Sequence, residues 1–322
     1  MGDDATQAEQ ATVSVASESL WDEDLTSAYH KVRELWIRDQ RIGMPTEALI
    51  AARRLADRAP QNAHVQVLLG FVALSARCFK ESYLALMQAD YLHPLEITTR
   101  LACFANFMMR GEELATLNVD GVTYRFPLSA HTTQMIETGA AHCAGELTEL
   151  EELRYLNSVL KKPEVMVEVG VLCGNHSAYF LQNFQPTKLI LIEADPSMHP
   201  ILDRTVAANN PGNSSVQCHT AFVGKQNGLL RSFADATVPE RSLSSLISEP
   251  IDFLKVDVDG AELDVLAGAE SLILDCQPFV MIETEQNTDL QVQEWFLSRG
   301  FALEHRIERG DYFNSFFKAA ST

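Results

Sequence analysis

Acidic side chains stand where apolar segments of this chain end, and they are the residues best placed to do chemistry. The four such residues are Glu168, Glu193, Asp257 and Glu283, at the ends of the runs 163–169, 188–193, 251–257 and 278–284. Short apolar runs that alternate with helical patterns predict the buried parallel strands of an α/β sheet. Because the carboxyl ends of parallel strands meet at one edge of a sheet, we expect these carboxylates to lie near one another.

A glycine-bearing turn follows the first of these runs. Gly170 and Gly174 lie between Glu168 and a helical pattern that begins near Asn175. Glycine has no Cβ, so such a turn lets a ligand approach the backbone. The Gly-x-x-x-Gly spacing lacks the third glycine of a dinucleotide fingerprint, which disfavours a nicotinamide oxidoreductase and favours a cofactor without a pyrophosphate. The alternative interpretation is that the glycines serve only tight packing.

Glu193 is the candidate ligand for a ribose. It lies 25 residues after Glu168, near the interval at which an acidic side chain binds ribose hydroxyls in nucleotide-binding sheets. One carboxylate accepts hydrogen bonds from both vicinal hydroxyls. Asp195 precedes Pro196, an order that is typical of a helix N-cap. We therefore assign the ribose to Glu193 and the cap to Asp195, with a purely capping role for Glu193 as the alternative.

Asp257 and Asp259 belong to the most specific motif, the segment 251–269. In an extended strand these two positions share a face, so their carboxylates are expected to cooperate. Together with Glu283 they are candidates for the general base that removes a proton from a hydroxyl nucleophile. The same cluster is a candidate to hold a hard divalent cation such as magnesium, and the spacing does not choose between these roles.

Nearby histidines and one further glutamate have weaker assignments. His176, beside the glycine turn, is another candidate base, and the alternative is a surface residue on the first helical turn. For Glu262 we favour capping of the helix that starts near Gly260. His131, His142 and Cys143 do not have the spacing of metal ligands, so the sequence gives no support for zinc.

The segment 251–269 resembles the FkbM family of class I S-adenosylmethionine-dependent methyltransferases, whose hallmark is a strand ending in Lys-Ile-Asp-x-Glu-Gly-x-Glu. The matching residues are Lys255, Asp257, Gly260, Glu262, Leu266 and Gly268. Asp259 replaces the usual glutamate. The first motif also matches, with Glu168 for the family's aspartate and with Val171 and Leu172 for its Ala-Asn pair. Residues 278–283 match a later strand that ends in glutamate, and the resemblance covers approximately residues 115–320.

The resemblance implies a Rossmann-like sheet of seven mainly parallel strands with the final strand antiparallel. The chain supplies seven apolar runs for it, at 163–169, 188–193, 215–219, 251–257, 278–284, 301–307 and 312–317. The last two runs are separated only by residues 308–311, which is too short for a helical crossover. These two strands must therefore form an antiparallel pair.

The resemblance also implies S-adenosylmethionine as the cofactor. The residues expected to bind it are Glu168, Gly170, Gly174, Asn175, Glu193 and Asp257, and the catalytic candidates are Asp257, Asp259, Glu283 and His176. No residue is assigned as a metal ligand, and magnesium stays open as a second cofactor. We expect O-methylation of a hydroxyl on a small natural product or sugar. The alternatives are a peptide or nitrogen acceptor, and a non-catalytic interaction protein that uses its helical repeats.

The chain divides into three zones: a flexible acidic tail at 1–24, a helical zone at 25–110 and the methyltransferase-like zone at 111–322. In the helical zone, Leu35, Ala48 and Pro60 recur 34 residues later as Leu69, Ser82 and Pro94. This echo resembles two tetratricopeptide repeats, at 29–60 and 63–94, followed by a helix at 96–109; a plain helical bundle is the alternative. Two repeats are too few for a free solenoid, so we expect support from the next domain, a homodimer or a protein partner. Asp120-Gly121 predicts a β-hairpin after them.

Charge argues against several classes of partner. The chain has 44 acidic residues against 25 Lys and Arg, and 16 of the 19 excess negative charges lie in residues 111–322. Such a surface repels nucleic acid and anionic membranes. The acidic start of the chain has no basic, apolar signal-peptide pattern, and the six cysteines form no Cys-x-x-Cys pair. We therefore expect a cytoplasmic protein that acts on a small molecule.

Overall fold

The computed structural model describes residues 23–40, 46–129, 132–233 and 236–320. The predicted tail at 1–24 lies outside these ranges except for Glu23 and Asp24, where the first described helix begins. The described chain forms two compact units, one up to Thr148 and one from Glu149, and each is described by itself. The predicted border at 110 falls inside the first unit, at the end of its run of helices.

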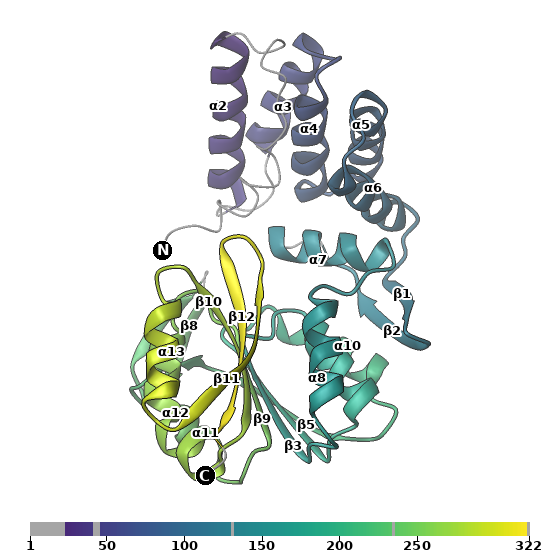
Figure 1. The fold of residues 1–322 in the computed structure, drawn as a ribbon. Coiled ribbons are helices and arrows are strands. Elements are labelled where there is room, and N and C mark those ends of the chain that lie inside the picture. Colours follow the sequence, from purple (N-terminus) through teal and green to yellow (C-terminus); the bar gives the residue numbers. More distant parts are fainter. Residues whose placement is uncertain (1–22, 41–45, 130–131, 234–235, 321–322) are drawn as a thin grey trace. The chain divides into compact units, whose positions relative to one another are not determined.

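The described part of the first unit begins with five helices. They are α2 (Glu23–Gln40), α3 (Thr46–Arg58), α4 (Ala63–Ser75), α5 (Phe79–Leu92) and α6 (Glu96–Met109) (Figure 1). The predicted helix at 96–109 is confirmed as α6. The α4–α5 pair packs closely at Gly70, where a Cβ would lie 2.5 Å from Leu86 Cγ. Close helix pairs fit repeats of the tetratricopeptide kind, which stay a prediction. None of the helices described is both long and apolar enough to cross a membrane.

A hairpin and a further helix complete the first unit. Strands β1 (Leu114–Val119) and β2 (Val122–Pro127) pair antiparallel, and α7 (Thr133–Cys143) follows. Asp120 and Gly121 connect the strands with φ of 52° and 83°. Two consecutive positive φ angles are what a two-residue type I′ turn requires, so the predicted hairpin is confirmed.

The second unit is built on a seven-stranded sheet. Its strands are β3 (Val165–Val169), β4 (Lys188–Glu193), β5 (Ser215–Thr220), β9 (Phe253–Val256), β10 (Phe279–Glu285), β11 (Phe301–Glu308) and β12 (Tyr312–Ala319). They lie in the order β11-β12-β10-β9-β3-β4-β5. Strand β12 runs antiparallel to both of its neighbours, and the other strands of this sheet all run in one direction. The predicted strands, their mainly parallel sheet and its antiparallel final strand are confirmed.

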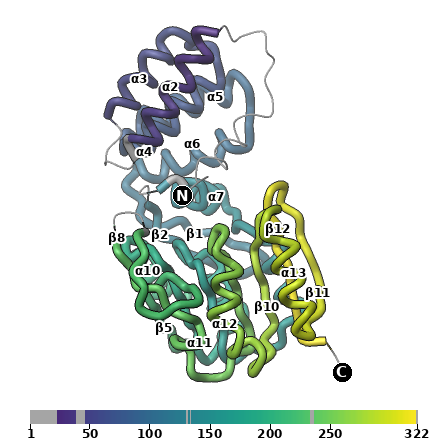
Figure 2. Tube along the Cα trace, turned by 90° about the vertical axis from the view of Figure 1, so that its left-hand side faces the viewer, coloured from purple at the N-terminus to yellow at the C-terminus, as the bar shows by residue number. Residues whose placement is uncertain are grey.

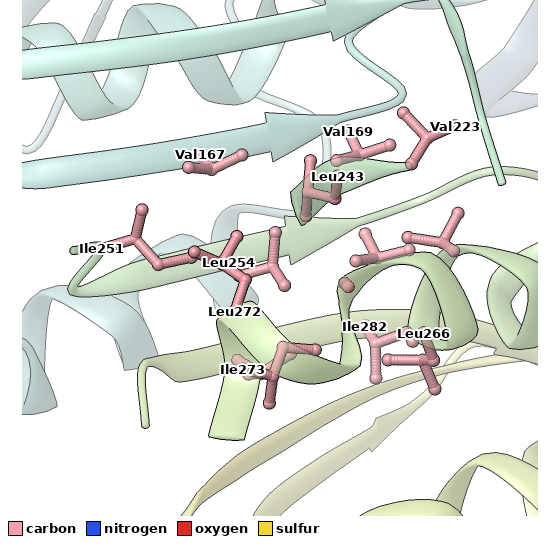
Figure 3. Packing of buried hydrophobic residues seen from close by; sticks show 14 of the residues in the cluster. Val167, Val169, Val223, Leu243, Ile251, Leu254, Leu266, Leu272, Ile273 and Ile282 are labelled. Carbon is pink, nitrogen blue, oxygen red and sulfur yellow. The ribbon is translucent and has the colours of Figure 1, made fainter. Parts of the chain in front are cut away.

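Helices cover both faces of this sheet (Figures 1 and 2). The helices of the unit are α8 (Leu150–Val159), α9 (Asn175–Tyr179), the π-helical turn η2 (Phe180–Phe184), α10 (His199–Asn209), α11 (Leu243–Leu246), α12 (Glu262–Cys276) and α13 (Asp289–Leu297). Figure 3 shows the core on one face, where Val167 and Leu254 of the sheet pack with Leu266 and Ile273 of α12. On the other face Phe180 contacts Phe253. Burial on both faces explains why the central strands are apolar without alternation.

A small three-stranded sheet, absent from the sequence predictions, follows β5. It consists of β6 (Phe222–Val223), β7 (Leu230–Phe233) and β8 (Ala236–Arg241), with β8 in the middle. Glu240 is fully buried and accepts hydrogen bonds from Arg231 and from the backbone of Gln226. No apolar run marks these short strands, so periodicity does not reveal them.

Gly170 joins β3 to the turn at the carboxyl edge of the sheet, and a substitution at this position tests the fold. Its φ is +78°, and a Cβ there would lie 1.6 Å from the carbonyl oxygen of Asp257. We expect Gly170→Ala to destabilise the protein by more than about 3 kcal/mol, because a positive φ and a backbone clash combine. Urea unfolding measures this effect.

Gly228 is the matched control. Its φ is +84°, but a Cβ there would meet nothing within 4 Å. Gly228→Ala should therefore cost only about 1 kcal/mol. Equal losses for the two variants would show that the close approach of Gly170 to Asp257 does not matter.

Candidate active site

The glycine turn after β3 is held by its own backbone contacts. Gly170 donates its N–H to Ile192 O at 3.0 Å, and Asp257 donates its N–H to Val169 O at 3.0 Å. Gly174, with φ +85°, begins α9, and a Cβ there would lie 2.9 Å from Leu202 Cδ1. Close packing thus accounts for both glycines without a ligand. The turn still carries its backbone to the carboxyl edge between β3 and β4.

Glu193 braces that turn. Its Oε2 accepts hydrogen bonds from the N–H groups of Val171 (3.0 Å) and Leu172 (2.8 Å), and its Oε1 accepts one from Asp195 N at 2.8 Å. The side chain is only 7% exposed. Since a carboxylate has about four acceptor positions, Oε1 retains one for a ribose hydroxyl. The ribose role of Glu193 stays a prediction, and the brace is an additional role that the motif did not reveal.

Asp195 has a different local role from the predicted one. Its Oδ1 accepts a hydrogen bond from Ser197 N at 2.8 Å, and helix α10 begins only at His199. The side chain therefore closes the turn that leads to the helix. It does not cap a helix that starts at Pro196.

Asp257, Asp259 and Glu283 converge at the carboxyl edge of β9 and β10. One oxygen from each lies within 4.8 Å of the others. The shared strand face expected for 257 and 259 is wrong, because β9 ends at Val256 and Asp259 has φ +47° in a turn. The turn brings Asp259 back beside Asp257, and Glu283 follows the pair Ile282–Val256 of the parallel register.

Glu262 stabilises this turn. Its Oε1 accepts a hydrogen bond from Gly260 N at 2.7 Å, and the side chain is buried in the first turn of α12. This contact agrees with the structural role favoured from the sequence. Glu262 therefore shapes the loop that carries Asp259.

Lys255 is the buried cation of the site. Its Nζ donates to Asp257 Oδ2 at 2.8 Å and lies 3.9 Å from Glu168 Oε1. Burial alone would lower the pKa of Lys255, but Asp257, Glu168 and Glu149 raise it above its usual value. Lys255 matched the family motif, but no role was predicted for it from the sequence. Its parallel register with Glu168 explains the contact.

His176 lies between two carboxyl groups. Its Nε2 is 2.9 Å from Glu149 Oε2, and its Nδ1 is 3.9 Å from Glu168 Oε1. The residue is 7% exposed, so the alternative of a surface residue is wrong. Because both ring nitrogens face carboxyl groups, the geometry favours a positioning role. The catalytic role of His176 stays a prediction.

Glu149 was missed by the sequence analysis. It precedes α8 with φ +54°, and its Oε1 accepts a hydrogen bond from Asn314 Nδ2 at 3.2 Å. Glu152, one turn later, is fully buried and accepts two hydrogen bonds from Arg309, at 2.8 and 2.7 Å. This clamp fixes the start of α8 against the β11–β12 hairpin. No local pattern joins residues that are 165 positions apart.

The pKa values of two carboxyl groups in this cluster, those of Glu149 and Glu283, are shifted in opposite directions. Burial alone would raise the pKa of Glu149, but His176, Lys255 and Asn314 lower it to about 2. For Glu283, burial raises the pKa strongly, and the neighbouring Asp257 and Glu149 raise it further. A hydrogen bond between Glu283 and Glu149 acts in the same direction. Glu283 therefore keeps its proton at neutral pH.

The chain's relation to known proteins agrees with this arrangement. Residues 168–303 match the family model described as the methyltransferase FkbM domain. These residues are thus similar to an FkbM methyltransferase domain. The family implies S-adenosylmethionine as the methyl donor. No curated protein matches the chain in a sequence search.

The solved structures that match this chain have low sequence identity and TM-scores below 0.5. The FkbM methyltransferase from Methylobacillus flagellatus is 21% identical, with a TM-score of 0.44, over 69% of this chain and 60% of that one. A putative methyltransferase from Escherichia coli is 13% identical, with a TM-score of 0.41, over 64% of this chain and 99% of that one. A putative RNA methyltransferase from Pyrococcus horikoshii is 13% identical, with a TM-score of 0.38, over 53% and 80%. The chain thus spans less than two thirds of the first of these proteins.

The residues at the FkbM site fit the cofactor that the family implies. Among the described residues, Glu168 Oε1 is buried and has no hydrogen-bond partner, while Oε2 accepts from Ser177 Oγ at 2.6 Å. An amino group such as that of S-adenosylmethionine is a suitable donor for this oxygen. Glu193 has a free acceptor position for the ribose. Asn175 is 7% exposed and is the first residue of α9, directly after the turn.

We expect Glu193→Gln to weaken both the fold and cofactor binding. A glutamine offers one oxygen and one NH₂ group, so either the Val171 and Leu172 amides or the Asp195 amide would face another donor. The loss should be about 1–3 kcal/mol in urea unfolding, and S-adenosylmethionine should bind at least about tenfold more weakly in calorimetry.

Asp195→Asn is the control for Glu193→Gln, because asparagine keeps the oxygen that Ser197 N uses. It should leave both quantities near the wild-type values. If the Glu193→Gln protein is as stable in urea as the wild type and binds S-adenosylmethionine with the same affinity, Glu193 does not stabilise the turn.

Glu283→Gln tests the raised pKa of Glu283. Because its folded pKa lies above the unfolded value, its contribution to stability is fully present below about pH 4.3 and is lost as pH rises toward the folded pKa. Glutamine does not ionise and can donate to Glu149. The variant should therefore gain at least about 1 kcal/mol over the wild type between pH 5 and pH 8.

The measurement is urea unfolding across that range of pH, with the exposed Glu285→Gln as the control. Parallel curves of stability against pH for wild type and Glu283→Gln would contradict the raised pKa.

Proposed function

We propose that this protein transfers a methyl group from S-adenosylmethionine to a hydroxyl oxygen of a small natural product or sugar. The observation that carries the proposal is the convergence of Asp257, Asp259 and Glu283 at the carboxyl edge. The glycine turn and Glu193 lie at the neighbouring strand ends of the same edge. A donor pocket and a carboxylate cluster side by side are what methylation of a hydroxyl needs.

A hydroxyl must lose its proton as the new C–O bond forms, so a carboxylate within hydrogen-bond reach assists the transfer. S-adenosylmethionine supplies an electrophilic methyl group on a positively charged sulfur. Asp257 is kept in place by Lys255, and Asp259 is exposed at the edge. These two are the candidate bases, since Glu283 holds its own proton at neutral pH and is poorly suited to accept another.

Positioning supplies a further part of the rate, because the nucleophile must lie in line with the methyl carbon and the sulfur. Contacts within the site hold its side chains in the fixed positions that this alignment requires. Glu193 fixes the turn, Glu262 fixes the loop of Asp259, and Lys255 joins Asp257 to Glu168. Magnesium remains the alternative use of the three carboxylates, and methyl transfer in the presence of EDTA distinguishes it from direct base catalysis.

The experiment combines calorimetry with S-adenosylmethionine and transfer of its radiolabelled methyl group to a panel of small hydroxylated compounds. We expect binding with a Kd below about 1 mM and labelling of at least one hydroxyl compound. If S-adenosylmethionine does not bind, the proposal that the protein is a methyltransferase is wrong, and the alternative of a non-catalytic interaction protein is favoured. Labelling confined to peptides or nitrogen acceptors would replace the proposed acceptor.

Substitution of the candidate bases gives a sharper test on the compound that is labelled. Either Asp257→Asn or Asp259→Asn should lower kcat by about 100-fold, because general base catalysis typically contributes that much. Glu283→Gln should change kcat far less, since it replaces a group that is already neutral. If both aspartate variants retain more than half of the activity, neither aspartate is the base.

A further inference from the structure

The two carboxyl oxygens of Glu168 have different surroundings. Oε2 accepts a hydrogen bond from Ser177 Oγ at 2.6 Å. Oε1 is buried and has no hydrogen-bond partner among the residues that the structure describes. A buried acceptor without a donor is unfavourable, so a ligand that brings a donor to this oxygen is stabilised. Oε1 is therefore the oxygen of Glu168 that is left for a ligand.

Two nearby nitrogen groups do not serve as this donor. Lys255 Nζ and His176 Nδ1 each lie 3.9 Å from Oε1, beyond the range of an N–H···O hydrogen bond. Lys255 donates instead to Asp257 Oδ2 at 2.8 Å. His176 has its closer carboxyl partner on the other side of the ring, where Nε2 lies 2.9 Å from Glu149 Oε2. The donor that Oε1 lacks is thus one that a ligand can supply.

Ser177 holds the other oxygen of Glu168 from a fixed place. It belongs to α9, which follows the glycine turn directly, and all five residues of this helix are buried. Ser177 itself is fully buried, so its hydroxyl cannot exchange Glu168 for water unless the helix moves. A carboxyl group that is held at one oxygen is restricted in its rotation. Ser177 therefore sets the direction in which Oε1 points.

We propose that Ser177 is a positioning residue for the cofactor: it holds Glu168 so that Oε1 binds the amino group of S-adenosylmethionine. This inference rests on the proposed function. Ser177 acts through Glu168 and does not itself contact the cofactor. Because Oε2 is already fixed, the side chain of Glu168 does not have to be ordered when the cofactor binds, which favours binding.

The contact does not require one particular charge on Glu168. Burial raises the pKa of Glu168, and the neighbouring Lys255 opposes this rise. An ionised Glu168 accepts a hydrogen bond from an ammonium group, and a protonated Glu168 donates one to an amine. In both forms the amino nitrogen lies within hydrogen-bond distance of Oε1, while Ser177 holds the other oxygen.

Two ligands that differ only in the amino group test the proposal. They are S-adenosylhomocysteine and its deaminated analogue, in which a hydrogen atom replaces that group. Calorimetry on the full chain measures both affinities. We expect the wild type to bind S-adenosylhomocysteine at least about tenfold more tightly than the analogue, because a hydrogen bond between charged groups contributes that much. This ratio is the amino-group advantage.

Substitutions of Ser177 should lower the amino-group advantage. Ser177→Ala should reduce it to less than about threefold, because Oε2 loses its donor and Oε1 its fixed direction. Ser177→Cys keeps a side chain of similar shape with a weak donor and should act in the same direction. The control is Ser82→Ala, which removes another fully buried serine hydroxyl, the donor to Gly70 O at 2.7 Å. Ser82 lies in α5 of the first unit, so this variant should keep the full advantage.

A double-mutant cycle shows whether Ser177 acts through Glu168. Glu168→Gln should itself reduce the amino-group advantage, because a glutamine offers one oxygen and an NH₂ group in place of two oxygens. In the Glu168→Gln protein, Ser177→Ala should change the advantage by less than about twofold. A further loss as large as the loss in the wild type would overturn the positioning role.

The outcomes separate this inference from the proposed function. Failure of S-adenosylhomocysteine to bind the wild type would refute the function itself. Equal affinities of the wild type for the two ligands would refute only the contact between Glu168 and the amino group. If Ser177→Ala weakens the binding of both ligands by the same factor, Ser177 stabilises the fold and does not position Glu168. If Ser177→Ala does not fold, Ser177→Cys provides the same test.

Discussion

The active edge of this sheet depends on one buried ammonium group, that of Lys255. Strand β9 places it between Glu168 of β3 and Asp257, which follows β9, so it joins the two strands at the point where the order of the sheet reverses. Without it, two carboxylates would face each other in a region of low dielectric constant. A buried charge is tolerated only when it is paired. The lysine therefore makes it possible to assemble acidic groups at this edge.

A second constraint follows from the close approach of the turn to β9. Gly170 has no room for a side chain, and its neighbours Val171 and Leu172 direct their N–H groups to Glu193. The residue that would bind the ribose thus also holds the turn in shape. The predicted cofactor contact and the loop geometry thus involve one carboxylate, which holds the turn in shape without a ligand.

Much of this arrangement was open to prediction, because parallel strands have an unambiguous pattern. Four of the seven runs ended in or beside an acidic residue, and the topology of such sheets brings these ends together. The positions of Asp257 and Glu283 followed from that rule. Asp259 was correctly predicted to lie near Asp257, but the predicted reason was wrong. A turn with a positive φ at Asp259, and not a shared strand face, brings its carboxylate next to those of Asp257 and Glu283. The seven strands and their directions were likewise accessible from the runs and the loop lengths.

The missed residues share a physical cause: their roles depend on distant partners. Glu149 precedes an ordinary amphipathic helix, and Asn314 lies in an aromatic strand, so neither pattern indicates a polar contact. Lys255 matched a motif, but its burial among carboxylates follows only from strand register. The small sheet around Glu240 was not predicted, because its short strands contain no apolar run and the ion pair of Arg231 with Glu240 has no local sequence pattern.

The strand order also constrains how the site comes into being. Strand β12 follows β11 in the chain but lies between β11 and β10 in the sheet. During synthesis from the N-terminus, β10 therefore waits with an unpaired edge until β12 emerges. Asn314 and Arg309 arrive only then, so Glu149 lacks its contact with Asn314, and Glu152 its contact with Arg309, in every nascent chain that ends before them. The carboxyl cluster is therefore completed only when β12, which follows the other strands of this sheet in the chain, has joined it.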